Sequence, residues 1–308
     1  MATEDEPDAT PDAAAGSTSP TENQPDTRLS PLFEVLDELI VAAEESAASS
    51  SQSDDYLVDF DSNVLVRGIK GLKSARILIR AGQWEYSTAV ARQIFELLIN
   101  MEYLYSLANR EAAVKRYSWF GFLQFFLSEQ RRFDFMQERS PGKTPSDWEN
   151  SVRSTLDAHF DEFKLAPRAD GTPRWRSNWS GKTAKALAEL SSDPMRAKQY
   201  DLLFSTWSEQ THATPSIFTS DLFDRYEEEV LGEAMTEVTR LLPSSFSLIG
   251  GQGRREAHTL SMVIVLFTQL WRILPNAPRP IEDEAENRLK KVKEFMARRV
   301  LHPLPIAD

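Results

Sequence analysis

The stretch ARQIFELLINMEYLYSL, residues 91–107, decides the fold that the sequence predicts. At about 100° per residue, apolar side chains cover one broad side of this helix and recur on the other side, beside Arg92 and Glu96. A helix that is apolar nearly all round is buried among other helices. Arg92 and Glu96, four residues apart, are therefore expected to enter the interior, where charges are tolerated only when they are paired and hydrogen-bonded.

Helical periodicity continues on both sides of this stretch. Residues 30–46 begin with Ser30 as N-cap and Pro31 at the first helical position, and they repeat apolar residues on one stripe. Similar patterns predict helices over residues 61–81, 85–108, 111–139, 147–164, 182–190, 195–212, 254–274 and 282–300. No run alternates with the period of a strand, and no repeat is detectable. The expected fold class is all-α, a multi-helix bundle of about eight to nine helices.

The N-terminal segment differs in composition from the rest of the chain. Its first 28 residues hold seven Asp or Glu, one Arg and four prolines, which accounts for −6 of the net charge of −12. So little of this segment could be buried that its ordering entropy would not be recovered. We expect a disordered acidic tail over residues 1–29, followed by a single helical domain over residues 30–308.

Composition also excludes several classes of protein. The chain has no cysteine, so it has neither a disulfide framework nor a thiolate metal site. The N-terminus lacks the basic and apolar regions of a secretory signal, and the apolar run at residues 260–274 is shorter than the ~20 residues that a bilayer core requires. His159, His258 and His302 stand alone, so no metal and no cofactor is expected. The predicted protein is cytoplasmic, with no membrane partner.

Two basic segments are candidates for nucleic-acid contact. In the first, basic residues follow one another at helical spacing with no acidic residue between Asp61 and Glu85, which predicts a charged helix face. The members of this basic stripe are Arg67, Lys70, Lys73, Arg76 and Arg80. The second segment, PRWRSNWSGKTAK (residues 173–185), interleaves Trp175 and Trp179 with basic residues, a composition that can stack on bases or bind phosphates.

Both basic segments also have a structural interpretation. The stripe would then be a solvated outer helix face, and the tryptophans would plug the edge of the core. The acidic net charge repels nucleic acid overall, so a protein or small-ligand partner is favoured over a nucleic acid.

A second polar row lies on the helix expected over residues 195–212. Tyr200, Phe204, Ser208 and His212 follow at steps of four, which places Ser208 and His212 at the border of the buried face. His212 is also in the last turn, where an imidazolium can bond free carbonyl groups and interact favourably with the helix dipole. His212 is therefore either a helix cap or part of a site.

The RQIFE motif in an apolar helix, followed about a hundred residues later by Tyr200, Ser208 and His212, resembles an uncharacterised bacterial family of all-helical domains of unknown function. The resemblance covers residues 57–216 approximately, and it implies that Arg92, Glu96, Ser208 and His212 meet in space. The chain is also distantly similar to helical nuclease-toxin domains, which carry an Arg and a His five residues apart. This chain lacks that spacing, because in RRVLH Arg298 stands four residues before His302.

Two functions of different class are consistent with these residues. In the first, the four residues form a buried polar network that fixes helix register, and the protein works by binding another molecule. In the alternative, the protein is a metal-independent RNase in which His212 transfers a proton, Arg92 stabilises phosphoryl charge and Glu96 orients one of them.

Overall fold

The computed structural model describes residues 29–50, 54–142, 144–211, 252–278 and 290–291. The helices of this part of the chain are α1 (Ser30–Ser50), α2 (Tyr56–Arg80), α3 (Trp84–Ser106), α4 (Arg110–Arg139), α5 (Asp147–His159), α6 (Ala184–Glu189), α7 (Arg196–Thr211) and α10 (Gln252–Ile273). The predicted all-α fold class is confirmed. Residues 1–28 of the acidic tail expected over residues 1–29 lie outside the described residues, and so does the helix expected over residues 282–300, except for 290–291. Leu29, the last residue of the expected tail, is buried in the core.

Side-chain caps fix where several helices begin. Asp55 accepts a hydrogen bond from the backbone N–H of Leu57, so α2 begins earlier than the expected residue 61. Three further helices have the same kind of cap, supplied by Asn109, Ser146 and Thr183. These polar residues satisfy backbone donors that have no partner within the helix.

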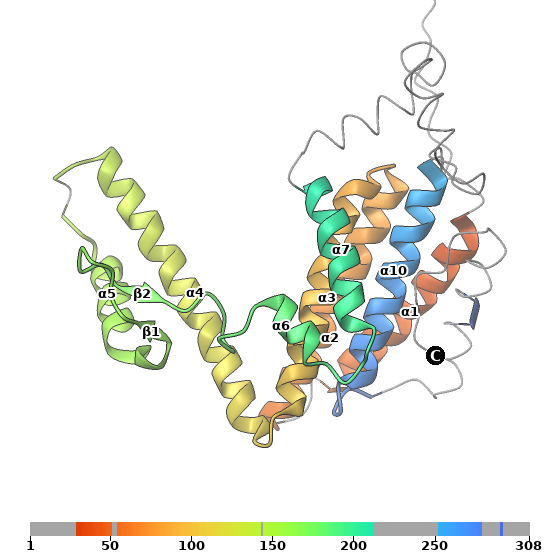
Figure 1. Cartoon of the computed structure of the whole chain (residues 1–308), viewed down its shortest axis with the longest axis horizontal. Coiled ribbons are helices and arrows are strands. Elements are labelled where there is room, and N and C mark those ends of the chain that lie inside the picture. Colours follow the sequence, from red (N-terminus) through yellow and green to blue (C-terminus); the bar gives the residue numbers. More distant parts are fainter. Residues whose placement is uncertain (1–28, 51–53, 143, 212–251, 279–289, 292–308) are drawn as a thin grey trace, which may run out of the picture.

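Helix α3 lies at the centre of a bundle (Figure 1). It packs against α2, α10 and α7, and α1 covers α2 from the outer side. The core is continuous across these helices, with Phe95, Leu98 and Phe267 fully buried. Nearly all of residues 260–274 are buried in α10, which confirms that this apolar run is a core helix. Among the described residues, no helix is long and apolar enough to cross a membrane.

The chain leaves the bundle along α4 and returns to it through α6. Helix α4 has 30 residues, so it is about 45 Å long at 1.5 Å per residue, and its far part carries α5 and a small hairpin (Figure 1). A second hydrophobic cluster holds this region together. It consists of Leu123, Val152, Leu156, Phe160 and Phe163. We call residues 119–175 the arm.

The arm differs from the sequence expectation in two details. Helix α5 ends at His159 instead of residue 164, because the chain turns through a 3-10 segment, Asp161–Phe163, that brings two phenylalanines into the second cluster. Strands β1 (Lys164–Leu165) and β2 (Arg174–Trp175) then pair antiparallel. Two residues are too few to show the alternation that identifies a strand in sequence.

The close approach of α2 and α10 gives a stability test. A Cβ at Gly68 would lie 2.8 Å and 2.9 Å from ring atoms of Phe267, whereas a Cβ at Gly121 in α4 would meet nothing within 4 Å. We expect Gly68→Ala to lower the free energy of unfolding by about 1–3 kcal/mol through overpacking. Gly121→Ala should instead raise it by roughly 0.5–1 kcal/mol, because alanine is the better helix former. Urea denaturation of both variants checks the pair, and equal effects would contradict this packing.

Candidate functional site

Among the residues that the structure describes, the most deeply buried ion pair joins Arg196 to Glu102. Arg196 Nη2 lies 2.7 Å from Glu102 Oε1, and Arg196 Nε donates to the same oxygen at 2.9 Å. The side chains of Arg196 and Glu102 are only 3% and 12% exposed. This pair connects the C-terminal part of α3 to the first residue of α7.

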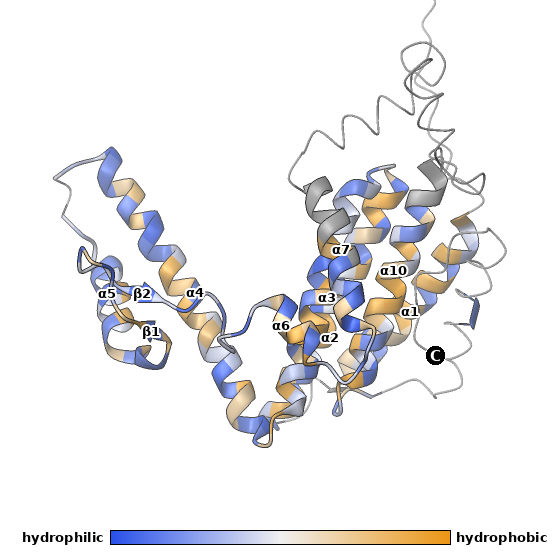
Figure 2. Ribbon diagram, in the orientation of Figure 1, coloured by the Kyte–Doolittle hydropathy of each residue, from blue (hydrophilic) through white to orange (hydrophobic). Residues whose placement is uncertain are grey.

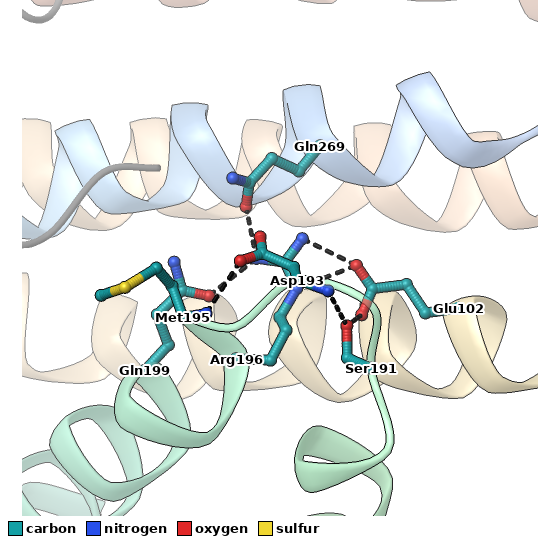
Figure 3. Close-up of polar contacts among 7 residues, drawn as sticks. All are labelled: Glu102, Ser191, Asp193, Met195, Arg196, Gln199 and Gln269. Carbon is teal, nitrogen blue, oxygen red and sulfur yellow. Dashed lines mark hydrogen bonds and ion pairs between the residues drawn. The ribbon is translucent and has the colours of Figure 1, made fainter. Parts of the chain in front are cut away.

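Other polar groups complete the arrangement around this pair (Figure 3). Arg196 Nη1 donates to Gln199 Oε1 at 2.7 Å and to Gln269 Oε1 of α10 at 2.9 Å. Ser191 donates to the second carboxylate oxygen of Glu102 at 2.8 Å, and Asp193 Oδ2 lies 3.3 Å from the Arg196 guanidinium. All three guanidinium nitrogens are thus engaged by protein groups, which is the arrangement of a structural network.

The sequence carries a signal for this network that the helical pattern alone did not identify. Arg196 stands in the first turn of α7, where the helix dipole disfavours a cation. Glu102 lies on the same nearly all-apolar helix as Arg92 and Glu96. A cation at the positive end of one helix and a carboxylate on a buried helix both require a partner, and they provide it for each other.

A second buried carboxylate anchors the start of α4. Asp61 is fully buried in α2 and accepts hydrogen bonds from Arg110 Nη2 at 2.7 and 2.8 Å and from the Tyr105 hydroxyl at 2.5 Å. The backbone N–H of Asn276 donates to it at 3.1 Å. Burial, reinforced by the hydrogen bond to Asp61, raises the pKa of Tyr105, so the phenol stays protonated. This cluster ties α2, α3, α4 and the segment after α10 together.

The predicted polar site is only partly visible. Arg92 Nε lies 3.2 Å from Glu96 Oε1, and the Arg92 guanidinium stacks on the ring of Phe204 at 4.1 Å from its centroid. The two charged side chains are 26% and 44% exposed, so the pair lies at the edge of the α3–α7 contact and the expectation that it enters the interior is wrong. The ring of Tyr200 also stacks on the ring of Phe204, and the two ring centroids are 4.3 Å apart.

The other two members of the predicted site cannot be added to this geometry. Ser208 belongs to α7, but its side chain lies outside the described residues, and so does the whole of His212. The meeting of Arg92 and Glu96 with Ser208 and His212, and the RNase role for His212, stay predictions.

The basic stripe of α2 faces acidic residues of α1. Arg76 Nη2 donates to Asp37 Oδ2 at 2.7 Å, Arg80 lies 3.5 Å from the same oxygen, and Lys73 is 2.5 Å from Glu44. These pairs offset much of the positive charge on which nucleic-acid contact was predicted. The remaining members, Arg67 and Lys70, are exposed.

One tryptophan of the second basic segment lies in the core. Trp179 is buried, donates from its indole nitrogen to Asn100 Oδ1 at 2.6 Å and packs against the rings of Tyr103 and Tyr117. This tryptophan has the structural role considered from the sequence, and it closes the bundle where the chain returns from the arm.

A family model described as a family of unknown function, DUF5677, matches residues 62–229. This chain belongs to that family. The match covers more than half of the chain, and it confirms the predicted resemblance to a family of unknown function. A search of curated proteins and a search of solved structures gave no match. Since the family description gives no reaction, the similarity to nuclease-toxin domains stays a prediction.

The arm of this DUF5677 protein presents an apolar surface to solvent. Large hydrophobic side chains that are exposed on α4 and α5 are Trp119, Phe122, Phe125, Phe135, Met136 and Trp148. Figure 2 shows apolar turns along α4 beyond its contact with the bundle. The sequence signal is WFGFLQFF, residues 119–126, where five aromatic residues in eight positions cannot all lie on one helix face.

No metal centre is visible in the described ranges of the DUF5677 chain. Within them, no group of three or more His, Asp and Glu side chains is placed to hold a metal ion. Of the histidines there, His258 is half-buried, and that burial lowers its pKa.

Breaking the central ion pair should be costly. We expect Arg196→Ala to lower the free energy of unfolding by about 3–5 kcal/mol, because it leaves the Glu102 carboxylate buried without its cation. Adding Glu102→Gln to Arg196→Ala should recover part of the lost free energy, and a double-mutant cycle of these two changes should show coupling. Lys115→Ala, which breaks an exposed pair with Glu111, is the control and should cost less than about 1 kcal/mol. An Arg196→Ala loss no larger than the control would contradict a stabilising network.

The half-buried pair at the α3–α7 edge gives a smaller expected effect. Arg92→Ala removes the stacking on Phe204 and the Glu96 pair, so it should cost about 1–2 kcal/mol, and Arg92→Lys should cost less.

Combining Arg92→Ala with His212→Ala tests the shared site by thermal and urea unfolding. Coupling beyond about 0.5 kcal/mol would place both residues in one network, and additivity would separate them.

Proposed function

We propose that this DUF5677 protein is a binding protein that contacts another protein through the aromatic surface of its arm. The observation that carries the proposal is the concentration of exposed large hydrophobic side chains on α4 and α5. Groups of exposed large hydrophobic side chains, such as Trp119, Phe122 and Phe125 along one stretch of α4, mark interaction sites.

The chemistry of the arm favours a protein over a nucleic acid. Phenylalanine, tryptophan, methionine and arginine are the residues enriched at protein interfaces, and all four occur on the exposed side of α4 and α5. A nucleic acid would be repelled by the net charge of −12, and the pairs between α1 and α2 neutralise part of the basic stripe.

The polar networks support this function by fixing the arm. Arg110, the first residue of α4, is held by Asp61, and Arg196 joins α7 to α3. Both guanidinium groups are engaged by protein carboxylates, which suits a structural role. We include the candidate set of Arg92, Glu96, Ser208 and His212 in this proposal as a polar network that fixes the register of α3 and α7.

Photo-crosslinking in cells that produce the protein tests the proposal. A photoreactive amino acid would replace Phe122 on the arm or, as a matched control, Ile77, an exposed apolar residue of α2. We expect a discrete covalent adduct of defined mass from position 122 and none from position 77. The adduct should disappear when Phe125→Glu is added, because a carboxylate opposes burial of this surface.

The mass of the adduct identifies the kind of partner. A mass twice that of the chain indicates a second copy, and any other discrete mass indicates a different protein. Equal labelling at positions 122 and 77, or no adduct from position 122, would overturn the proposed function.

A further inference from the structure

One line of residues along α4 has the spacing of a coiled-coil seam. Steps of three and four alternate along this line, which places its members on one face of the helix. The members are Phe122, Phe125, Glu129, Arg132, Met136 and Arg139, and we call this line the 122–139 seam. Phe122, Phe125 and Met136 are 55%, 51% and 53% exposed.

The large apolar members of the seam are exposed because α5 packs mainly on another side of α4. At the centre of the seam, Trp148 of α5 donates to Glu129, whose side chain is 18% exposed. The second hydrophobic cluster contains Leu123, and Phe126 and Leu127 pack beside it on the side of α4 that faces α5. Toward the bundle, the next seam position is Ser118, which accepts a hydrogen bond from Tyr56 of α2 at 3.0 Å. The exposed apolar members of the seam therefore begin at Phe122, and the seam runs about 26 Å from there to the end of α4.

The seam is complementary to itself when two copies run in opposite directions. An antiparallel partner centred between Glu129 and Arg132 places Phe125 against Met136, Phe122 against Arg139 and Glu129 against Arg132. Thioether groups pack well on aromatic rings, and a guanidinium is attracted to a ring face. The two central positions form two attractive charge pairs.

The opposite orientation lacks this complementarity. In a parallel pair, equivalent seam positions meet, so Glu129 would face Glu129 and Arg132 would face Arg132. Within one chain, Arg132 already donates to Glu129 at 2.8 Å, and the Trp148 indole N–H donates to the same carboxylate oxygen at 3.1 Å. An antiparallel partner adds alternating charges to this group, whereas a parallel partner adds like charges.

We propose that a second copy of this chain docks antiparallel along the 122–139 seam and forms a two-fold symmetric dimer. This inference rests on the proposed binding function of the arm, and it names the partner. A two-fold interface requires that one surface match itself, and the order of apolar, acidic, basic and apolar residues along the seam meets that requirement.

Sedimentation velocity of the full chain over a range of concentrations tests the dimer. We expect a concentration-dependent dimer, and Phe125→Glu should raise its Kd by roughly a hundredfold or more, because each dimer would bury two unpaired carboxylates. Ile77→Glu is the matched control and should leave the Kd unchanged. A wild type that stays monomeric at every concentration, or a Phe125→Glu variant that dimerises like the wild type, overturns the proposal.

A charge exchange tests whether positions 129 and 132 meet at the centre of the dimer. Glu129→Arg and Arg132→Glu should each abolish self-association, because four like charges would meet at the centre of the dimer. An equimolar mixture of the two variants should dimerise, because each Arg at position 129 or 132 then faces a Glu. A mixture that remains monomeric while both variants retain the wild-type circular dichroism spectrum overturns a dimer centred on these two positions.

Engineered disulfides provide a second measurement that leaves Glu129 and its bond to Trp148 intact. The chain has no cysteine, so Phe125→Cys mixed with Met136→Cys should give a covalent dimer under oxidation, and neither variant should do so alone. Crosslinking of Phe125→Cys to itself would indicate a parallel pair and overturn the proposal.

The dimer and the binding function can fail separately. A monomeric wild type that still gives an adduct of another mass from position 122 ends the second-copy inference and retains the arm as a docking surface. Absence of any adduct from position 122 ends both.

Discussion

Helix α3 packs against α2, α7 and α10, and this constraint organises the bundle. Its apolar residues drive the burial, but its sequence also carries Glu102 into a place where the carboxylate side chain is only 12% exposed. An unpaired carboxylate there would cost several kcal/mol, so a cation has to reach it from a neighbouring element. Arg196 does so from α7, and its third nitrogen then binds Gln269 of α10. One buried charge thus fixes the mutual positions of three helices.

The Asp61 cluster applies the same logic at the base of the arm. Arg110 is the first residue of α4, and its guanidinium is held by a fully buried carboxylate. Tyr105 at the end of α3 shares that carboxylate and stacks under the guanidinium, with 4.7 Å between Arg110 Cζ and the ring centroid. The direction in which α4 leaves the bundle is therefore set by directional hydrogen bonds. A surface presented by a fixed helix loses less conformational entropy on binding than one on a loop.

The arm itself contains more aromatic surface than its small cluster can cover. Helix α5 and the hairpin bury Leu123 and pack beside Phe126, while Phe122 and Phe125 remain outside. The uncovered residues follow a regular seam that is complementary to itself in one orientation. In the part of the chain that the structure describes, the bundle pairs its buried charges around Glu102 and Asp61, whereas the arm leaves large aromatic side chains exposed.

Periodicity and capping chemistry were sufficient to predict the all-α class and most helices, because both depend on residues close together in sequence. The burial of residues 260–274 and the core position of α3 follow in the same way from apolar residues at helical spacing. The sequence also showed that charges on α3 require partners. It did not show which charges would be buried, since Arg92 lies at an edge where Phe204 stacks on it, while Glu102 lies deeper.

Only the tertiary structure decided the pairs between distant residues. Arg196 follows Glu102 by 94 positions and Arg110 follows Asp61 by 49, and no local pattern specifies such a contact. The basic stripe likewise appeared free in sequence because its acidic partners belong to α1. The exposure of Phe122 and Phe125 depends on the side of α4 that α5 covers, and that choice is made by packing between elements. Local periodicity determines which residues share a helix face, and the arrangement of helices determines whether that face meets protein or solvent.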